Sequence, residues 1–331
     1  VLNEETGRIF RIAPKQSLAE NWEGRYSDLS KLTDAELVAL QTNKSSWHAR
    51  RARLILQGRA AKAPLAKEVH DQLRKIYQTN TSIDFRLNAM WALHVTRGFT
   101  EAQLIEALGD KDEFVRGWAV QLLSEDKAPV QAVEKFVAMA EKDKSAVVRL
   151  YLASALQRIQ PEQKWAVAEA LMGHAEDVED HNLPKMIWFG TEPLVAENPD
   201  RALQLAAKSK IPMLAEYIAR RVVDADATEK LIAAIGKKPE TTMSMLEGMR
   251  NGLEGRTDLS APANWQKVYD NLQSSRVEKV KQLALEVAQF YGDTEAAKQY
   301  LATLKNKNTP IDQRLKALNA LADQQREELA R

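Results

Sequence analysis

The chain has no cysteine among its 331 residues. Thiolate nucleophiles, structural zinc sites built on cysteine, iron–sulfur clusters and covalently attached c-type haem are therefore excluded. The compartment stays open, because a chain without thiols suits the cytosol and the periplasm equally. No apolar run approaches the roughly 20 residues that a membrane-spanning helix needs, so we expect a chain that does not span a membrane.

An excess of charge of either sign is also missing. The 47 Lys and Arg residues stand against 46 Asp and Glu residues, which gives a formal net charge of +1. A nucleic-acid-binding domain normally shows a basic excess or stripe, so we expect no nucleic-acid partner. One short basic group, which we interpret as a solvated helix face, comprises Arg50, Arg51, Arg53, Arg59 and Lys62.

The common catalytic and cofactor-binding motifs are lacking too. There is no phosphate-binding glycine loop, Gly-x-Ser-x-Gly elbow or dinucleotide fingerprint. No two histidines have the i, i+4 spacing of a helical zinc pair. The acidic run between His174 and His181 has oxygen ligands suited to a hard cation but lacks the glycine of an EF-hand loop, and we interpret it as a solvated link. We therefore predict no catalytic residue, no metal and no cofactor.

What the chain does have is a pattern that recurs about every 30 residues. An arginine follows an apolar residue, a small or apolar residue comes three positions after the arginine, and a leucine comes seven positions after it. The arginines of this pattern are Arg86, Arg116 and Arg149, and near the end of the chain Arg314 is again followed by a small residue, Ala317, and by Leu321. A fixed period in this range is typical of a repeat array.

The repeated arginine has a structural explanation. Its stem can lie along the adjoining repeat while its guanidinium reaches carbonyl groups or a carboxylate. We expect a ladder of Arg–Asp pairs along the stack, with ligand-binding arginines as the alternative. The carboxylates near these arginines in the sequence are Asp84, Asp110, Asp112 and Glu113.

From Thr33 onward the pattern is helical. Thr33 and Glu36 form a capping-box pattern, and prolines are expected in the first turns of helices at Pro64, Pro129, Pro161, Pro199, Pro239 and Pro310. Gly248 and Gly252 within a helix suggest a close helix neighbour, since each helical glycine costs about 1 kcal/mol. The predicted helices are 34–41, 46–57, 64–79, 83–97, 100–108, 112–124, 129–142, 145–159, 161–174, 184–197, 199–208, 212–223, 227–236, 240–253, 264–273, 275–291, 294–305 and 310–325.

The predicted fold class is all-α, a right-handed α-solenoid of HEAT-like helical pairs over residues 33–331. Its central segment, about 175–265, fits the repeat pattern poorly. Residues 1–13 contain the alternating stretch Gly7–Ile12, which predicts one short strand belonging to a sheet outside this chain. Residues 14–32 are expected to be a linker. The chain begins with Val1, and we expect it to be a piece of a longer protein or a processed product.

The arginine pattern resembles HEAT repeats, and other segments resemble a particular family. They are similar to the helical region of large exported dehydrogenase-like proteins of planctomycetes and verrucomicrobia. The central segments that carry this resemblance are 180–189, 192–194, 201–203, 211–212 and 218–221. Further matching segments are 7–12, 28–37, 50–56 and 246–256, with Trp47, Pro262 and Trp265.

In that family a sugar-dehydrogenase-like β-propeller comes first, a HEAT-like region follows, and a c-type cytochrome domain often ends the chain. The resemblance implies that this chain is a non-catalytic scaffold, which orients the redox domains of a periplasmic or otherwise exported electron-transfer protein. Its partners would be the propeller-like and cytochrome c-like domains of the same parent, a sugar-type dehydrogenase. Two departures limit the match, because only the last propeller strand is present and no Cys-x-x-Cys-His occurs.

A candidate interface lies in the central segment. Trp188 and Glu192 are four residues apart and share a helix face, and His181 and Asn182 precede them. A tryptophan with polar neighbours is a common interface anchor. Core packing of Trp188 and a catalytic use of the group are the alternatives.

Two other functions stay open. A free-standing, cytoplasmic solenoid could bind a protein or peptide on its surface. A helical-repeat enzyme, such as a lyase, would instead gather His48, His94, His174 and His181 in a groove. The positions of these histidines distinguish the enzyme from a scaffold.

Overall fold

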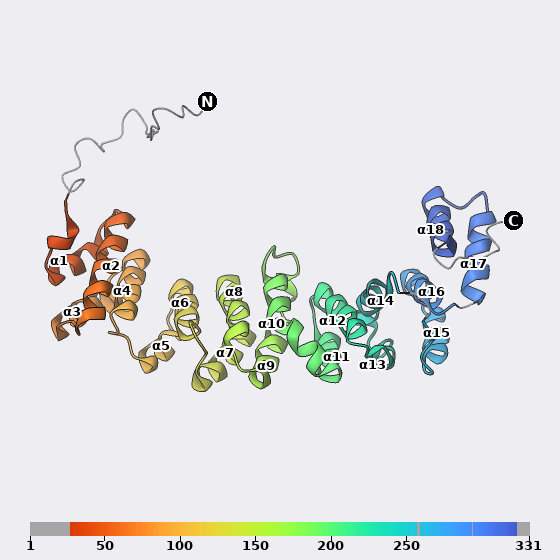
Figure 1. Ribbon diagram of the computed structural model, residues 1–331, viewed down its shortest axis with the longest axis horizontal. Coiled ribbons are helices and arrows are strands. Elements are labelled where there is room, and N and C mark those ends of the chain that lie inside the picture. The colour runs from red at the N-terminus through yellow and green to blue at the C-terminus, as the bar shows by residue number, and fades with distance from the viewer. Residues whose placement is uncertain (1–26, 257–258, 293, 323–331) are drawn as a thin grey trace, which may run out of the picture. The chain divides into compact units, whose positions relative to one another are not determined.

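The computed structural model describes residues 27–256, 259–292 and 294–322 (Figure 1). In these ranges every regular element is a helix and no strand occurs. The helices pack against their neighbours in sequence order, which confirms the prediction of an all-α solenoid. The strand expected within residues 1–13 lies outside the described residues, as does most of the expected linker.

The chain divides into two compact units, Val1–Thr100 and Glu101–Arg331, a boundary that the sequence analysis does not anticipate. The N-terminal unit contains η2 (Leu29–Lys31), α1 (Asp34–Ala39), η3 (Leu40–Thr42), α2 (Ser46–Lys62), α3 (Lys67–Thr79) and α4 (Ile83–Val95). The C-terminal unit contains α5 (Glu101–Ala107), α6 (Glu113–Leu123), α7 (Val130–Lys142), α8 (Ala146–Ala155), η4 (Leu156–Arg158), α9 (Pro161–Leu171), η5 (Ala175–Asp177), α10 (Leu183–Glu197), α11 (Pro199–Lys208), α12 (Pro212–Asp224), α13 (Thr228–Ala234), α14 (Pro239–Leu253), α15 (Trp265–Gln273), α16 (Glu278–Phe290), α17 (Thr294–Lys305) and α18 (Ile311–Ala322).

In the N-terminal unit, α2 and α3 both pack against α4, and α1 packs against α2 and α3. Helix α2 runs five residues past its predicted end at residue 57. One reason is Arg59, whose Nη1 donates to Asp34 at 2.5 Å and whose Nη2 donates to the carbonyls of Ser30 (2.9 Å) and Leu32 (2.7 Å). The apolar core of this unit is made by Leu29, Leu37, Val38, Ala52, Leu56, Val69, Leu73, Ala89, Ala92 and Leu93.

In the C-terminal unit the helices from α5 to α16 form two layers. The even-numbered helices α6, α8, α10, α12, α14 and α16 lie side by side, each against the next. The odd-numbered helices make the second layer, in which α7 packs on α9, α11 on α13 and α13 on α15. Figure 1 shows the two rows of this unit. Helices α10 to α14, in the segment whose sequence fits the repeat pattern poorly, follow the same alternation.

Helices α12 and α14 approach each other closely where Gly248 and Gly252 face α12. A Cβ atom on Gly248 would lie 2.1 Å from the carbonyl oxygen of Glu216, and one on Gly252 would lie 2.8 Å from Cβ of Val223. Real Cβ atoms essentially never come so close. The close helix neighbour expected for the two glycines is therefore confirmed.

The predicted helices match the observed ones to within a few residues at most ends. Pro161, Pro199 and Pro239 lie in the first turns of α9, α11 and α14, as expected. The prediction for Pro64 is wrong, because α3 begins only at Lys67. The chain stays extended before it, since Leu65 packs on the core of the N-terminal unit.

Candidate interaction surface of the helical repeats

The arginine of the repeat pattern joins successive repeats through bidentate ion pairs. Arg116, on α6, donates from Nε and Nη2 to the two carboxylate oxygens of Asp143, at 2.7 and 2.8 Å. Its Nη1 donates to the carbonyls of Asp110 (3.0 Å) and Lys111 (3.1 Å) in the loop before its own helix. One guanidinium thus joins the loop before α6 to the loop before α8.

The next repeat has the same arrangement in a more buried form. Arg149, on α8, donates from Nε to Asp177 at 2.6 Å and from Nη2 to the second oxygen at 2.5 Å, while its Nη1 donates to the Asp143 carbonyl at 2.9 Å. Both side chains of this pair are only 3% exposed. Asp143 therefore accepts through its carboxylate from one rung and through its carbonyl from the next.

The partner carboxylates in these two rungs, Asp143 and Asp177, are not the ones that the sequence analysis names. They lie 27 and 28 residues after their arginines, in the loop that precedes the following even-numbered helix. Arg86 donates to the Tyr77 carbonyl at 2.8 Å, and Arg314 donates to the Leu304 carbonyl at 3.0 Å. The described hydrogen bonds of all four arginines are made to groups of the protein, which supports the structural explanation over ligand-binding arginines.

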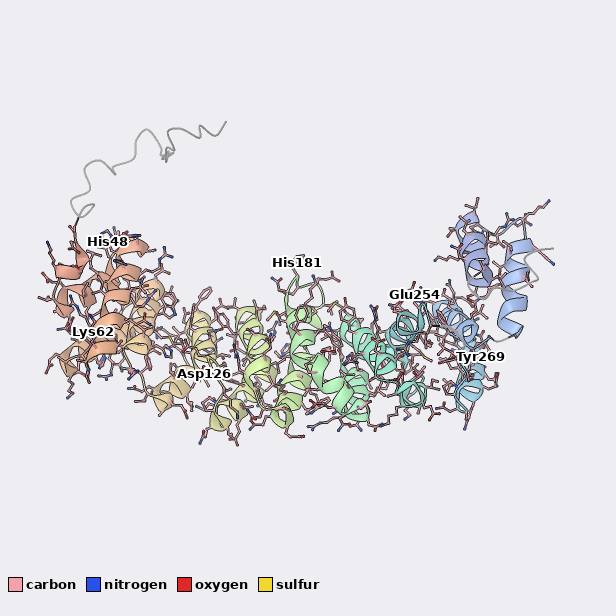
Figure 2. All side chains as sticks on the ribbon, viewed as in Figure 1. His48, Lys62, Asp126, His181, Glu254 and Tyr269 are labelled. Carbon is pink, nitrogen blue, oxygen red and sulfur yellow. The ribbon has the colours of Figure 1, made fainter. Side chains whose placement is uncertain are left out.

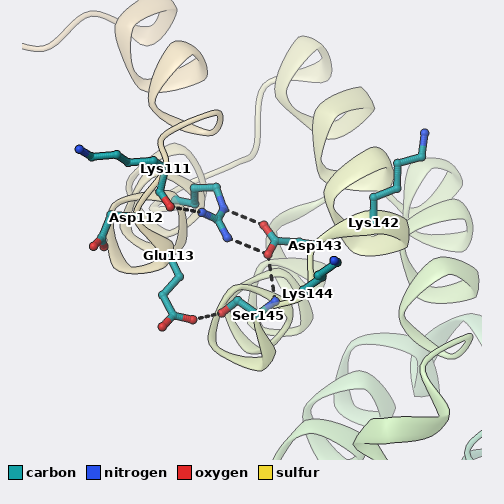
Figure 3. Close-up of a pocket in the computed structure, with 8 residues that line it drawn as sticks. Lys111, Asp112, Glu113, Lys142, Asp143, Lys144 and Ser145 are labelled. Atoms are coloured by element: carbon teal, nitrogen blue, oxygen red, sulfur yellow. Dashed lines mark hydrogen bonds and ion pairs between the residues drawn. The ribbon is translucent and has the colours of Figure 1, made fainter.

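The Arg116 rung lines an open surface depression, shown in Figure 3. Partial burial works against ionisation of Asp143, but the bonds from Arg116 and from the Ser145 amide hold its pKa below the ordinary value. The Ser145 hydroxyl bonds to Glu113 and also caps α8 by accepting from the Val148 amide. The acidic groups here are engaged with neighbours, which gives the depression a structural role. It is lined by Lys111, Asp112, Glu113, Arg116, Lys142, Asp143, Lys144 and Ser145.

The acidic run before α10 is also structural, and the interpretation of it as a solvated link is wrong for part of it. Asp177 is buried in the ladder. Asp180 accepts from the backbone amides of Leu183 (2.7 Å) and Asn182 (2.9 Å) at the start of α10, and these bonds lower its pKa. Glu176 lies 2.7 Å from Nδ1 of His174.

The four residues of the candidate interface occupy two different places. His181 and Asn182 are exposed in the loop that leads into α10, where Figure 2 labels His181. Trp188 and Glu192 lie further along the helix and face α12. The Trp188 ring packs on Tyr217 with centroids 5.4 Å apart, and Glu192 accepts a hydrogen bond from Arg221. The structure thus pairs Trp188 and Glu192 with α12 and leaves His181 and Asn182 at the loop.

Trp188 belongs to a larger surface feature that the sequence analysis misses. Six aromatic side chains that are exposed or half-buried lie on α6, α8, α10 and α12, and we call them the aromatic row. Trp118 packs on Tyr151 at 6.0 Å, as Trp188 packs on Tyr217. Phe189 is 61% exposed and Phe114 is 44% exposed. The aromatic row comprises Phe114, Trp118, Tyr151, Trp188, Phe189 and Tyr217.

A signal for part of the row is present in the sequence. Trp118 comes two residues after Arg116, and Tyr151 comes two residues after Arg149. Each aromatic ring thus occupies the same position of the repeat, on the side of the helix away from the buried leucines.

The outer side of the odd-numbered helices has a different chemistry. Ion pairs join α9 to α11 and α11 to α13, and all their side chains are well exposed. Water screens such pairs, so this layer is a solvated surface. The pairs are Arg201–Glu162 at 3.3 Å, Lys208–Glu169 at 2.5 Å and Lys230–Asp200 at 2.7 Å.

The histidines fall into both units. His48 and His94 belong to α2 and α4 of the N-terminal unit, whereas His174 and His181 belong to the C-terminal unit. His174 contacts the Ala140 carbonyl through Nε2 at 2.7 Å, which ties the end of α9 to α7. Among the described residues, no group of three His, Asp or Glu side chains is placed to hold a metal ion. None of the helices in these ranges combines the length and the apolar character that crossing a bilayer requires.

Comparison with known proteins adds no family. No family model matches the chain, and no curated protein does either. Among solved structures, the chain is similar to an engineered protein with 15% sequence identity, over 88% of this chain and 78% of that one. The TM-score of 0.27 is too low for this likeness to carry an argument.

Proposed function

We propose that this chain is a non-catalytic helical-repeat scaffold, which holds a partner protein or domain against the aromatic row of its C-terminal unit. The contrast between the two helical layers carries the proposal. Ion pairs occur in both layers, whereas the half-buried and exposed aromatic rings described in α5 to α15 all lie on even-numbered helices. Aromatic residues are enriched in protein interfaces, and exposed apolar patches on folded proteins commonly mark interaction sites.

The geometry of the row suits a rigid docking surface. Trp118 and Trp188 are half-buried and held by Tyr151 and Tyr217 of the next even-numbered helix, so little side-chain freedom remains to be lost on binding. Phe189, which follows Trp188 on α10, is 61% exposed. Full burial of a phenylalanine side chain is worth about 1.5–3 kcal/mol, which makes Phe189 the natural anchor.

The identity of the partner rests on the family resemblance. If the resemblance holds, the partners are propeller-like and cytochrome c-like domains of one longer, exported protein, and the scaffold sets the path between its redox centres. The segment 180–189, which carries much of the resemblance, includes Trp188 and Phe189 of the row. A free-standing solenoid that binds a separate protein or peptide would use the same surface.

The helical-repeat enzyme is the less supported alternative. It needs histidines gathered in one groove, whereas the described contacts of His174 tie α9 to α7. His181 lies exposed in the loop before α10. The proposal therefore assigns binding to the chain and catalysis, if any, to other domains.

The proposal is tested with a photo-crosslinking amino acid placed at Phe189, in the cells that produce the protein. The matched control carries the same amino acid at Gln204, which is exposed on α11. We expect one defined crosslinked product from Phe189 and none from Gln204. A product within the same longer protein supports the scaffold of redox domains, and a product with a separate protein supports the free-standing solenoid. Equal labelling at both positions, or none at either, contradicts the proposal.

A further inference from the structure

Helix α2 of the N-terminal unit carries an unusual concentration of positive charge. Its 17 residues include five basic side chains and no acidic one. Figure 2 labels His48 near its beginning and Lys62 at its end. Of these five, Arg59 is fully engaged with Asp34 and two carbonyls. The arginines in the middle of the helix have no such partners.

Arg50, Arg51 and Arg53 take part in no ion pair within the part of the chain that the structure describes. The recorded hydrogen bond of Arg50 is a long one, 3.4 Å, to the Ser46 carbonyl of its own helix. Arg53 is half-buried, with its guanidinium 4.9 Å from the centre of the Trp91 ring on α4. Its Nη1 is buried and has no hydrogen-bond partner. A buried charged donor without an acceptor costs free energy, and because this atom is buried, an incoming carboxylate reaches Arg53 only through its other guanidinium nitrogens.

The charges around Arg53 increase this cost. Burial and the neighbouring Arg50 both lower the pKa of Arg53, so the two guanidinium groups repel each other. The aromatic contact with Trp91 fixes the plane of the Arg53 guanidinium. A planar fork held in this way is prepared for the two oxygens of a carboxylate.

Two large apolar side chains flank the arginines on the outer side of α2. Trp47 is 53% exposed and Leu54 is 57% exposed. Spacings of three, four and seven residues place Trp47, Arg50, Arg51 and Leu54 on one helix face. A tryptophan and arginines together are the residues that most often dominate protein interfaces. We call Trp47, Arg50, Arg51 and Leu54, with Arg53 at the border toward α4, the arginine face of α2.

We propose that the arginine face of α2 binds an acidic protein segment. Its carboxylates engage Arg50, Arg51 and Arg53, and its apolar side chains cover Trp47 and Leu54. A protein segment fits better than a nucleic acid for two reasons. The exposed leucine needs apolar cover that a phosphate backbone does not provide, and the positive charge is confined to one helix of a chain with a net charge of only +1.

The test measures binding of a fluorescein-labelled peptide of alternating glutamate and leucine to the full chain, by fluorescence anisotropy. The variant Arg50→Gln/Arg51→Gln, whose side chains are exposed, is expected to keep its melting temperature. We expect it to bind at least about tenfold more weakly, because two charged contacts with the peptide are lost. Replacing leucine by glycine in the peptide, or Trp47→Ser in the chain, should also weaken binding.

Three controls make the result decisive. Lys237→Gln/Lys267→Gln removes the same charge from exposed positions of the C-terminal unit and should bind normally. Phe189→Ser should also bind normally, which separates this face from the aromatic row. Arg53→Lys keeps the charge and loses the planar fork, and should weaken binding. The proposal is overturned if the peptide does not bind, if the lysine control loses as much affinity, or if mixed-sequence single-stranded DNA binds more tightly through the same arginines.

Discussion

The Arg–Asp ladder allows a quantitative test, because the described ion pairs form a series of decreasing burial. Both side chains of Arg149–Asp177 are 3% exposed, those of Arg116–Asp143 are 18% and 8% exposed, and those of Arg201–Glu162 are 43% and 89% exposed. In each pair the carboxylate can be neutralised with little change of shape, by Asp177→Asn, Asp143→Asn and Glu162→Gln. Each change leaves the guanidinium charged and removes its hydrogen-bonded carboxylate, although Glu176 remains 3.7 Å from Arg149.

The expected losses of unfolding free energy follow from burial. Breaking a buried pair costs about 3–5 kcal/mol, which applies to Asp177→Asn. A charged hydrogen bond at a partly exposed site is worth about 1.5–3 kcal/mol, which applies to Asp143→Asn. An exposed pair contributes about 0–1 kcal/mol, so Glu162→Gln should be nearly neutral and serves as the control.

The measurement is urea unfolding followed by circular dichroism. Hydrogen exchange of α8 accompanies it, because repeat arrays unfold in parts as well as globally. If Asp177→Asn costs no more than Glu162→Gln, then the ladder is a surface pattern and the reasoning from burial is wrong. A loss for Asp143→Asn equal to that for Asp177→Asn would show that exposure of the pair does not set its contribution.

Three further predictions follow from the C-terminal unit. Gly248→Ala should lower the melting temperature, because overpacking against the α12 backbone costs about 1–3 kcal/mol or more. The control variant Gly58→Ala, on α2, meets no atom within 4 Å and should stabilise the fold by up to about 1 kcal/mol. Equal effects of the two variants would contradict the close approach of α12 and α14. Burial and the nearby Glu247 raise the pKa of the Glu216 carboxyl, so its ionisation destabilises the fold as the pH rises through the raised pKa. Glu216→Gln should therefore raise the melting temperature by about 1–3 °C at pH 7 and give no gain in acid. A gain that is equal at both pH values would refute the assignment. Trp188→Ala should lower the melting temperature by removing its packing on Tyr217, while Phe189→Ser should leave it unchanged and impair only partner binding; calorimetry of both variants separates packing from docking.

The correspondence between sequence and structure is closest for the helices. Their positions follow from apolar periodicity and from local capping, as at Thr33 and Glu36, where the expected capping box forms with a 2.7 Å bond from the Thr33 amide. Such signals depend on residues within one or two turns. Where the prediction for an end is wrong, a contact distant in sequence decides, as when Arg59 bonds to carbonyls of residues 30 and 32 and α2 continues past Gly58.

The candidate interface was harder to predict. The sequence indicates Trp188 as a candidate interface residue, but it does not indicate the partner Tyr217. The two rings meet only because α10 lies beside α12. The same holds for the Nη1 atom of Arg53, whose burial without a hydrogen-bond partner depends on which groups of α4 lie around it.

The sequence by itself determined that the described chain is a series of helices, because apolar spacing and helix caps act within a few residues. It also determined that arginines recur at equivalent places in the repeat. Only the tertiary structure decided that Asp143 and Asp177 complete the two ladder rungs, and that the aromatic rings of α6 and α8, and of α10 and α12, pack in pairs on the even-numbered layer. These outcomes depend on which helices become neighbours, and each joins residues some thirty positions apart that no local pattern connects.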